Sequence, residues 1–383
     1  MKRPSTTSQL RSLTSTIAIL AVSLILTSTH TAAAATSNST SNSTSSPPNC
    51  DCYLVSGPSP GFFTHHHFID FRNLSSLLPS PIKHNASATP TTVPTMATAG
   101  TEAPTSPYFT KDSAFTSFWT ISNSTGPFSW NDGGVVPQVA SAQNVWVSGS
   151  SGNDTYLALR TTRTPSFQSV AEVDSIEKEM LYVKRVDEGG VFGLFTYQSD
   201  TQESDLEICS RDDTETVHVT NQPDVDSKGN EVDGATEEVT LPDKLKWTQW
   251  VDLRIDWFKG QSRWYADGLS IANLTKNVPS VASGVVLNVW SDGGEWSGNM
   301  TVGGEFVVGV EWIEVAYNVS ADGGRGGSCA VGCWIDGDDV KQTGTPAQAY
   351  DSTSQQQGAA MRQMSTGVWL VALVTVGLIL GLM

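Results

Sequence analysis

An alternation of apolar and polar side chains runs through the middle of the chain and limits what it can fold into. The clearest segments are 145–147, 156–159, 177–183, 191–197, 250–257 and 306–313. Gly, Asn, Asp and Pro separate them at short intervals, and no convincing helical stretch interrupts them. Successive side chains of a strand point to opposite faces, so the pattern is typical of strands with one buried face. The sequence predicts an all-β sandwich of two packed antiparallel sheets.

The two ends of the chain have the composition of targeting segments. Residues 1–35 combine early Lys and Arg residues, a short apolar core and a run of Ala, which is the order of a secretory signal peptide. Residues 361–383 hold a polar spacer and an uncharged apolar tail, and small residues precede them at 352–354 and 358–360. This order is typical of a glycosylphosphatidylinositol (GPI) attachment signal, with a plain tail anchor as the alternative. We expect a secreted protein held outside the plasma membrane or in the cell wall, with the membrane reached only through this lipid or tail.

Three low-complexity stretches divide the remainder. Residues 36–48 form a Ser/Thr/Asn-rich linker, 79–110 a Pro/Thr/Ala-rich insertion, and 336–360 a polar stalk. The folded domain is therefore predicted to span 49–335, with 79–110 as a surface insertion. Glycosylation sequons agree with export, and they lie at Asn38, Asn42, Asn73, Asn85, Asn123, Asn153, Asn273, Asn299 and Asn318.

The net charge of −17 excludes some classes of partner. Nucleic acid and anionic membranes would repel such a chain, whereas an uncharged polysaccharide would not. Consecutive histidines at 65–67 point to alternate faces of a strand, so they cannot all bind one ion. We expect no metal, no cofactor and a monomer.

Five cysteines fit an oxidising compartment. Cys50 and Cys52 open the folded region, and Cys329 and Cys333 close it. These four are expected to form two disulfides that tie the ends of the domain together, with the connectivity left open. Cys209 is left over.

The stretch Glu203-Ser-Asp-Leu-Glu207 is the candidate catalytic motif. In a strand, Glu203, Asp205 and Glu207 share one face, while Leu206 can enter the core from the other. Neighbouring carboxylates repel each other, so at least one pKa should rise. A retaining glycosidase requires one ionised carboxylate and one protonated carboxyl about 5–5.5 Å apart. The Cα atoms of the two Glu residues are roughly 13 Å apart along a strand, so their side chains would have to lean together.

The surroundings of the motif resemble glycoside hydrolase family 16, particularly its secreted, lipid-anchored fungal members. The resemblance covers roughly 49–320 and has its parts in order: 191–197, 203–207, 217–223, 250–257, 263–268 and 287–296. It implies a concanavalin A-like jelly-roll sandwich with a substrate cleft across a concave sheet, and cleavage with retention of configuration. It also implies that Glu203 is the nucleophile, Asp205 its helper and Glu207 the general acid/base. The short spacing of the motif favours 1,3-linked glucan over strictly mixed-linkage glucan.

Five further residues are predicted to bind the sugar. Alternation places Asn288 and Trp290 on the cleft face, opposite Leu287 and Val289. Trp296 lies in a Gly-rich loop, and Tyr197 ends the strand before the acidic motif. The resemblance adds Asn221 as a polar contact.

The predicted function is endo-acting cleavage of β-glucan, β-1,3 or β-1,3/1,4, in a cell wall or extracellular polysaccharide. A cell-wall transglycosylase would use the same residues with a sugar as acceptor. A non-catalytic, lectin-like glucan-binding protein would not need two Glu residues at this spacing, and a purely structural wall glycoprotein would not bind glucan.

Overall fold

The structure is a computed structural model that describes residues 49–57, 61–78, 95, 100–124, 128, 134–149, 155–176, 181–183, 189–319 and 329–352. The chain divides into two compact units, Met1–Ser45 and Ser46–Met383, and every described residue lies in the second. The predicted signal peptide (1–35), linker (36–48) and attachment signal (361–383) lie outside the described residues. No helix within the described ranges has the length and apolar character needed to cross a membrane.

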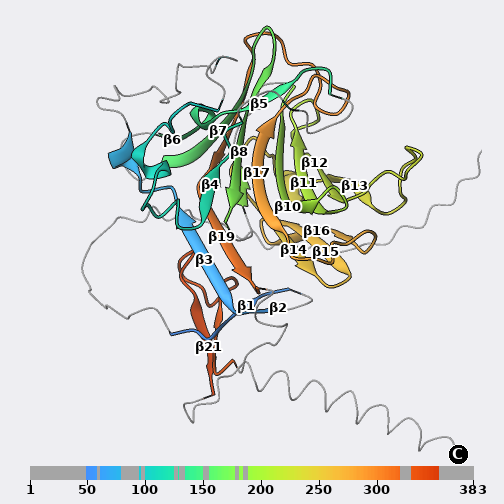
Figure 1. Cartoon of the computed structure of the whole chain (residues 1–383). Coiled ribbons are helices and arrows are strands. Elements are labelled where there is room, and N and C mark those ends of the chain that lie inside the picture. The colour runs from blue at the N-terminus through green and yellow to red at the C-terminus, as the bar shows by residue number, and fades with distance from the viewer. Residues whose placement is uncertain are drawn as a thin grey trace, which may run out of the picture. The chain divides into compact units, whose positions relative to one another are not determined.

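The largest sheet holds eleven strands within the described residues, and eight of them follow the order β13-β12-β11-β10-β17-β8-β7-β18. Strands β4 and β5 pair with β8, and β6 pairs with β7. Figure 1 shows β8, β17, β10, β11 and β12 side by side. The strands are β4 (Trp119–Ile121), β5 (Gln138–Ala140), β6 (Val145–Gly149), β7 (Thr155–Arg163), β8 (Gln168–Ser175), β10 (Val191–Ser199), β11 (Gln202–Cys209), β12 (Thr216–Asn221), β13 (Thr236–Thr240), β17 (Gly284–Trp290) and β18 (Glu305–Val310).

A second layer packs against this sheet. It comprises a four-stranded sheet in the order β16-β15-β14-β9 and the pair β19-β3. These strands are β3 (His65–Asp70), β9 (Leu181–Val183), β14 (Val251–Phe258), β15 (Gln261–Ala266), β16 (Leu269–Leu274) and β19 (Trp312–Tyr317). Leu206 and Leu287 from the large sheet share one core with Ile255, Trp264 and Ile313 from the second layer. The predicted all-β sandwich is therefore confirmed.

The arrangement departs from two purely antiparallel sheets. Two strand pairs are parallel: β5 with β8, and β1 (Cys52–Val55) with β20 (Val331–Trp334). The expected single strand at 306–313 is two strands in different sheets, β18 ending at Val310 and β19 beginning at Trp312. Val310 and Ile313 are both buried, which an unbroken alternation would not allow, so the break at Glu311 resets the buried face.

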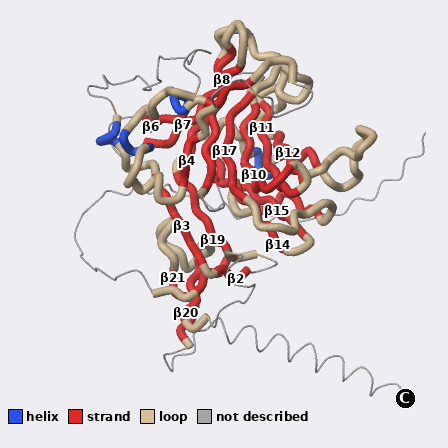
Figure 2. Tube along the Cα trace, viewed as in Figure 1, coloured by secondary structure: helices blue, strands red, loops and turns tan. Residues whose placement is uncertain are grey.

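Helices are short wherever the chain is described, and Figure 2 shows them as small blue segments among the strands. All are 3₁₀ turns: η1 (Ser75–Leu77), η2 (Pro107–Phe109), η3 (Ala142–Asn144) and η4 (Pro242–Lys244). Phe109 in η2 is buried in the main core and packs edge-on against Phe115. The end of the predicted 79–110 surface insertion is therefore part of the folded domain, because Phe109, which lies within this otherwise polar stretch, is buried.

The two ends of the described region form one small sheet in the order β2-β1-β20-β21. Its strands are β1 (Cys52–Val55), β2 (Gly61–Phe63), β20 (Val331–Trp334) and β21 (Ala347–Asp351). Disulfides Cys50–Cys333 and Cys52–Cys329 confirm the predicted pairing of the two ends and fix its connectivity. The predicted domain boundary at 335 is too early, because β21 pairs with β20 inside the expected 336–360 stalk.

Candidate active site

The three acids of the motif lie on one face of β11, as the alternation predicts. Leu206 and Ile208 are fully buried in the main core. Glu203, Asp205 and Glu207 therefore point to the other face of the large sheet. We call this the acidic face.

Neighbouring strands extend the acidic face in register. Glu207 lies opposite Gly193 on β10 and His218 on β12. Gly193 in turn lies opposite Asn288 on β17, which lies opposite Glu172 on β8. A Cβ atom at position 193 would come within 2.6 Å of the Asn288 Oδ1 atom, so only glycine leaves this space open.

Asp205 and Glu203 form a coupled carboxyl pair. Burial raises the pKa of Asp205 well above its usual range, and the charges of Glu203 and Glu207 add to that rise. Burial also raises the pKa of Glu203 to about 7. A hydrogen bond between the two carboxyls lowers the pKa of Glu203 and raises that of Asp205. The Gln222 amide donates to Asp205 Oδ2 at 3.3 Å.

The pKa of Glu207 is raised as well, slightly more than that of Glu203. Burial and the nearby Glu203 charge raise its pKa to about 8. The Trp296 indole N–H donates to Glu207 Oε2 at 2.9 Å and opposes that rise. Near neutral pH the acidic face can therefore hold an ionised Glu203 together with a protonated Glu207. That combination supplies a nucleophile and a proton donor on one strand.

The predicted aromatic residues differ in how much surface they offer. Tyr197 lies opposite Glu203, is 38% exposed and donates its hydroxyl to Asp200. Trp290 reaches the acidic face as predicted but is only 7% exposed, since it packs with Val191 and Cys209. Trp296 packs against the same cluster and meets the His218 ring edge-on at 4.7 Å.

The two predicted asparagines have opposite outcomes. Asn288 faces the acidic side, is 5% exposed, and its Oδ1 has no hydrogen-bond partner. Asn221 does not reach the acidic face: it lies on β12 opposite Ser204, on the core side of β11, and is fully buried. Its Oδ1 accepts from the Ser204 hydroxyl at 2.6 Å and its amide donates to the Lys276 carbonyl. Position 221 has the wrong alternation phase to reach the acidic face.

Sequence reasoning missed a second acidic strand. Glu172 and Asp174 on β8 share the acidic face with Asn288 and Val286 of β17. Burial, followed by the charge of Asp174, raises the pKa of Glu172 to about 7. The Ser122 hydroxyl donates to Asp174 Oδ2 at 2.7 Å. The signal was present as Glu-Val-Asp, the same alternation in a shorter form.

Cys209 has no disulfide partner and is buried. Burial raises the pKa of its thiol, which works against thiolate formation. With Asp212 and His218 it forms the one group of ligand-type side chains close enough to hold an ion in the described part of the chain. His218 is already paired with Asp212, at 2.7 Å.

No protein-family model matches this chain, and no curated protein matches its sequence. Solved structures do align with it. A β-glucanase of Bacillus licheniformis is 21% identical with a TM-score of 0.41, over 52% of this chain and 92% of that chain. A lichenase from a mouse hindgut metagenome is 19% identical with a TM-score of 0.40, over 51% and 92%. The laminarinase catalytic domain of Thermotoga maritima is 17% identical with a TM-score of 0.38, over 49% and 85%.

Proposed function

We propose that this chain is a retaining glycoside hydrolase of family 16 that cleaves β-glucan internally. The observation that carries the proposal is the geometry of β11, which places Glu203, Asp205 and Glu207 together on one face of the large sheet, opposite core-facing Leu206 and Ile208. The motif order along the sequence supports the family assignment. The glucanases and laminarinase with which the structure aligns are consistent with this substrate class.

In the proposed first step, Glu203 attacks the anomeric carbon while Glu207 gives its proton to the departing glycosidic oxygen. The bond from the anomeric carbon to that oxygen breaks and an ester to Glu203 forms. In the second step, Glu207 takes a proton from water, the water oxygen attacks the anomeric carbon, and Glu203 leaves as carboxylate. Two inversions give net retention. The proton on Asp205 limits charge repulsion beside Glu203 during both steps.

An uncharged sugar suits this face. Glu172, Asp174 and the three motif acids would repel an anionic polysaccharide, whereas hydroxyl groups can donate to carboxylates. Asn288 Oδ1 is a buried acceptor that a sugar hydroxyl would satisfy. Tyr197 offers an exposed ring for the apolar face of a sugar.

The test is turnover of soluble β-1,3-glucan and of mixed-linkage β-glucan by the full chain. We expect Glu203→Gln and Glu207→Gln each to lower the rate of reducing-end formation by at least about a thousandfold. Glu237→Gln is the matched control, because Glu237 is exposed and lies opposite core-facing Val219. Wild-type rates in either motif variant would overturn the assignment.

We further propose that the protein is exported and held outside the plasma membrane or in the cell wall by a GPI anchor. The two disulfides support an oxidising destination. Phosphatidylinositol-specific phospholipase C should release the activity from intact cells into the medium. Activity that stays with the membrane after this treatment but dissolves in detergent would indicate a tail anchor instead.

A further inference from the structure

A cavity of about 480 Å³ lies on the side of the sandwich away from the acidic face. Its floor is the outer face of β14, where Asp252, Arg254 and Asp256 alternate with core-facing Leu253 and Ile255. The acids of β11 point outward from the other layer, so the core separates the two sites. The volume falls within the usual range for small-molecule sites.

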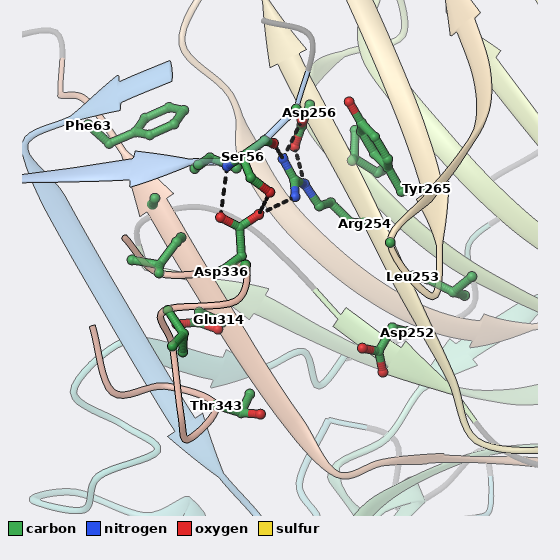
Figure 3. A pocket seen from close by; sticks show the side chains of 18 of the residues that line it. Ser56, Phe63, Asp252, Leu253, Arg254, Asp256, Tyr265, Glu314, Asp336 and Thr343 are labelled. Atoms are coloured by element: carbon green, nitrogen blue, oxygen red, sulfur yellow. Dashed lines mark hydrogen bonds and ion pairs between the residues drawn. The ribbon is translucent and has the colours of Figure 1, made fainter. Parts of the chain in front are cut away.

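The walls of this cavity come from both ends of the described region. Figure 3 shows Ser56 and Asp336 hydrogen-bonded to Arg254, with Phe63 on one side of this group and Tyr265 on the other. Phe63 belongs to β2, and Asp336 follows β20. The two disulfides join the strands that carry these walls. The cavity is therefore a built feature that depends on closure of the small terminal sheet.

Four of the charged groups that line the cavity, Arg254, Asp256, Asp336 and Glu314, already have a side-chain partner. Arg254 donates to both Asp256 oxygens, at 2.6 and 2.7 Å, and to Asp336 Oδ2 at 2.6 Å. Glu314 Oε1 lies 2.8 Å from His66 Nε2, and the Lys341 ammonium donates to the Asp338 carbonyl. Pairing of this kind is what makes partly buried charges tolerable. At these four positions a charged ligand would have to break an existing pair, so this part of the cavity favours an uncharged ligand.

The rest of the lining combines aromatic rings with neutral polar groups. Phe63, Trp257 and Trp312 are half-buried and line the cavity, and Gln342 and Thr343 add amide and hydroxyl groups. A neutral sugar matches both, since its ring has apolar faces and its edge carries hydroxyls. We propose that this cavity is a second saccharide-binding site, which binds a neutral sugar chain without cleaving it.

The choice of glucan as its ligand rests on the proposed function, whereas the site itself does not. A glucan bound in the cavity would keep the enzyme attached to its polymer while the acidic face cleaves successive bonds. The cavity carboxylates of Asp256 and Asp336 are bound by Arg254, so they provide no free acid pair for cleavage.

The experiment is calorimetric titration of the full-chain Glu203→Gln variant with a neutral β-1,3-linked glucose hexamer. We expect two sites per chain. Adding Phe63→Ala should weaken one of them about tenfold or more, and Thr343→Trp should block the same site by filling the cavity. Phe62→Ala is the matched control, because Phe62 is the neighbouring residue on β2, is 49% exposed and does not line the cavity.

Tyr197→Ala should weaken binding at the acidic face and leave binding in the cavity intact. Two sites that persist in both Phe63→Ala and Thr343→Trp would overturn the proposal, as would one site that neither substitution weakens. A single site that is lost in Phe63→Ala but unaffected by Tyr197→Ala would uphold the cavity and count against the acidic face as the glucan cleft.

Discussion

Glu207 illustrates how a single contact sets the chemistry at the residue scale. Burial favours its protonated form, while the Trp296 N–H hydrogen-bonds its charged form and holds the pKa near 8. In the role that we propose for Glu207, an acid/base must pass between these two forms within one turnover, so its pKa should stay near the working pH. Trp296 is therefore a positioning residue that also limits how far burial raises the pKa.

Replacing Trp296 with Phe should move the basic limb of kcat/KM to higher pH. The lost N–H lowered the pKa of Glu207, so its removal raises that pKa further, by about one pH unit for a hydrogen bond to a charged group. A pH profile of glucan hydrolysis measures the limb directly. Trp146→Phe is the control, because it removes an indole N–H that has no hydrogen-bond partner, and it should leave the limb unchanged. An unmoved basic limb in Trp296→Phe would show that Glu207 does not set it.

At the element scale, the acidic face depends on strands that keep one register. β10 pairs with β11 from Val191 to Tyr197 and with β17 over the same residues, which places Gly193 between Glu207 and Asn288. A slip of one residue would turn all three motif acids into the core. Gly193 is the position where this register leaves no room for a side chain.

Gly193→Ala should leave the fold in place but damage the site. The added methyl group would meet Asn288 Oδ1 at 2.6 Å, so Asn288 must shift into the space above the acidic face. We expect kcat/KM on glucan to fall about tenfold or more, while the thermal midpoint changes by only a few degrees. Parent-like kinetics would show that the Asn288 region does not contact the substrate.

Alternation predicted the acidic face well because it is a local property of one strand. It placed Glu203, Asp205 and Glu207 opposite Leu206, and put Asn288 on the same face as the acids. Asn221 came from the resemblance and not from alternation, and the pairing of β12 with β11 places it on the core side. The acids of β8 were missed because their place beside β17 is a long-range pairing.

At the scale of the whole molecule, two disulfides close nearly the same loop. Cys50–Cys333 spans 283 residues and Cys52–Cys329 spans 277. Composition identified the four cysteines but left their connectivity open, and the structure gives it as Cys50–Cys333 and Cys52–Cys329. The pairing of β21 with β20 extends the fold past the predicted boundary at 335, although the sequence of β21 is polar.

These bridges should stabilise the chain in a strongly non-additive way. Removing both, with all four cysteines changed to Ser, should lower the free energy of unfolding by roughly 5 kcal/mol, the value for loops of this size. Removing either bridge alone should lower it much less, because the other still closes the long loop. Urea unfolding of the three variants measures this, and two equal, additive losses would contradict it.

Trapping the glycosyl–enzyme tests the central claim most directly. A 2-deoxy-2-fluoro glucan glycoside with a dinitrophenyl leaving group forms the ester quickly, because its leaving group needs no proton, and releases it slowly. Mass spectrometry of the digested protein should find the sugar on Glu203, and labelling should persist in Glu207→Gln but disappear in Glu203→Gln. A label on another residue, or turnover with inversion and no label, would contradict the account.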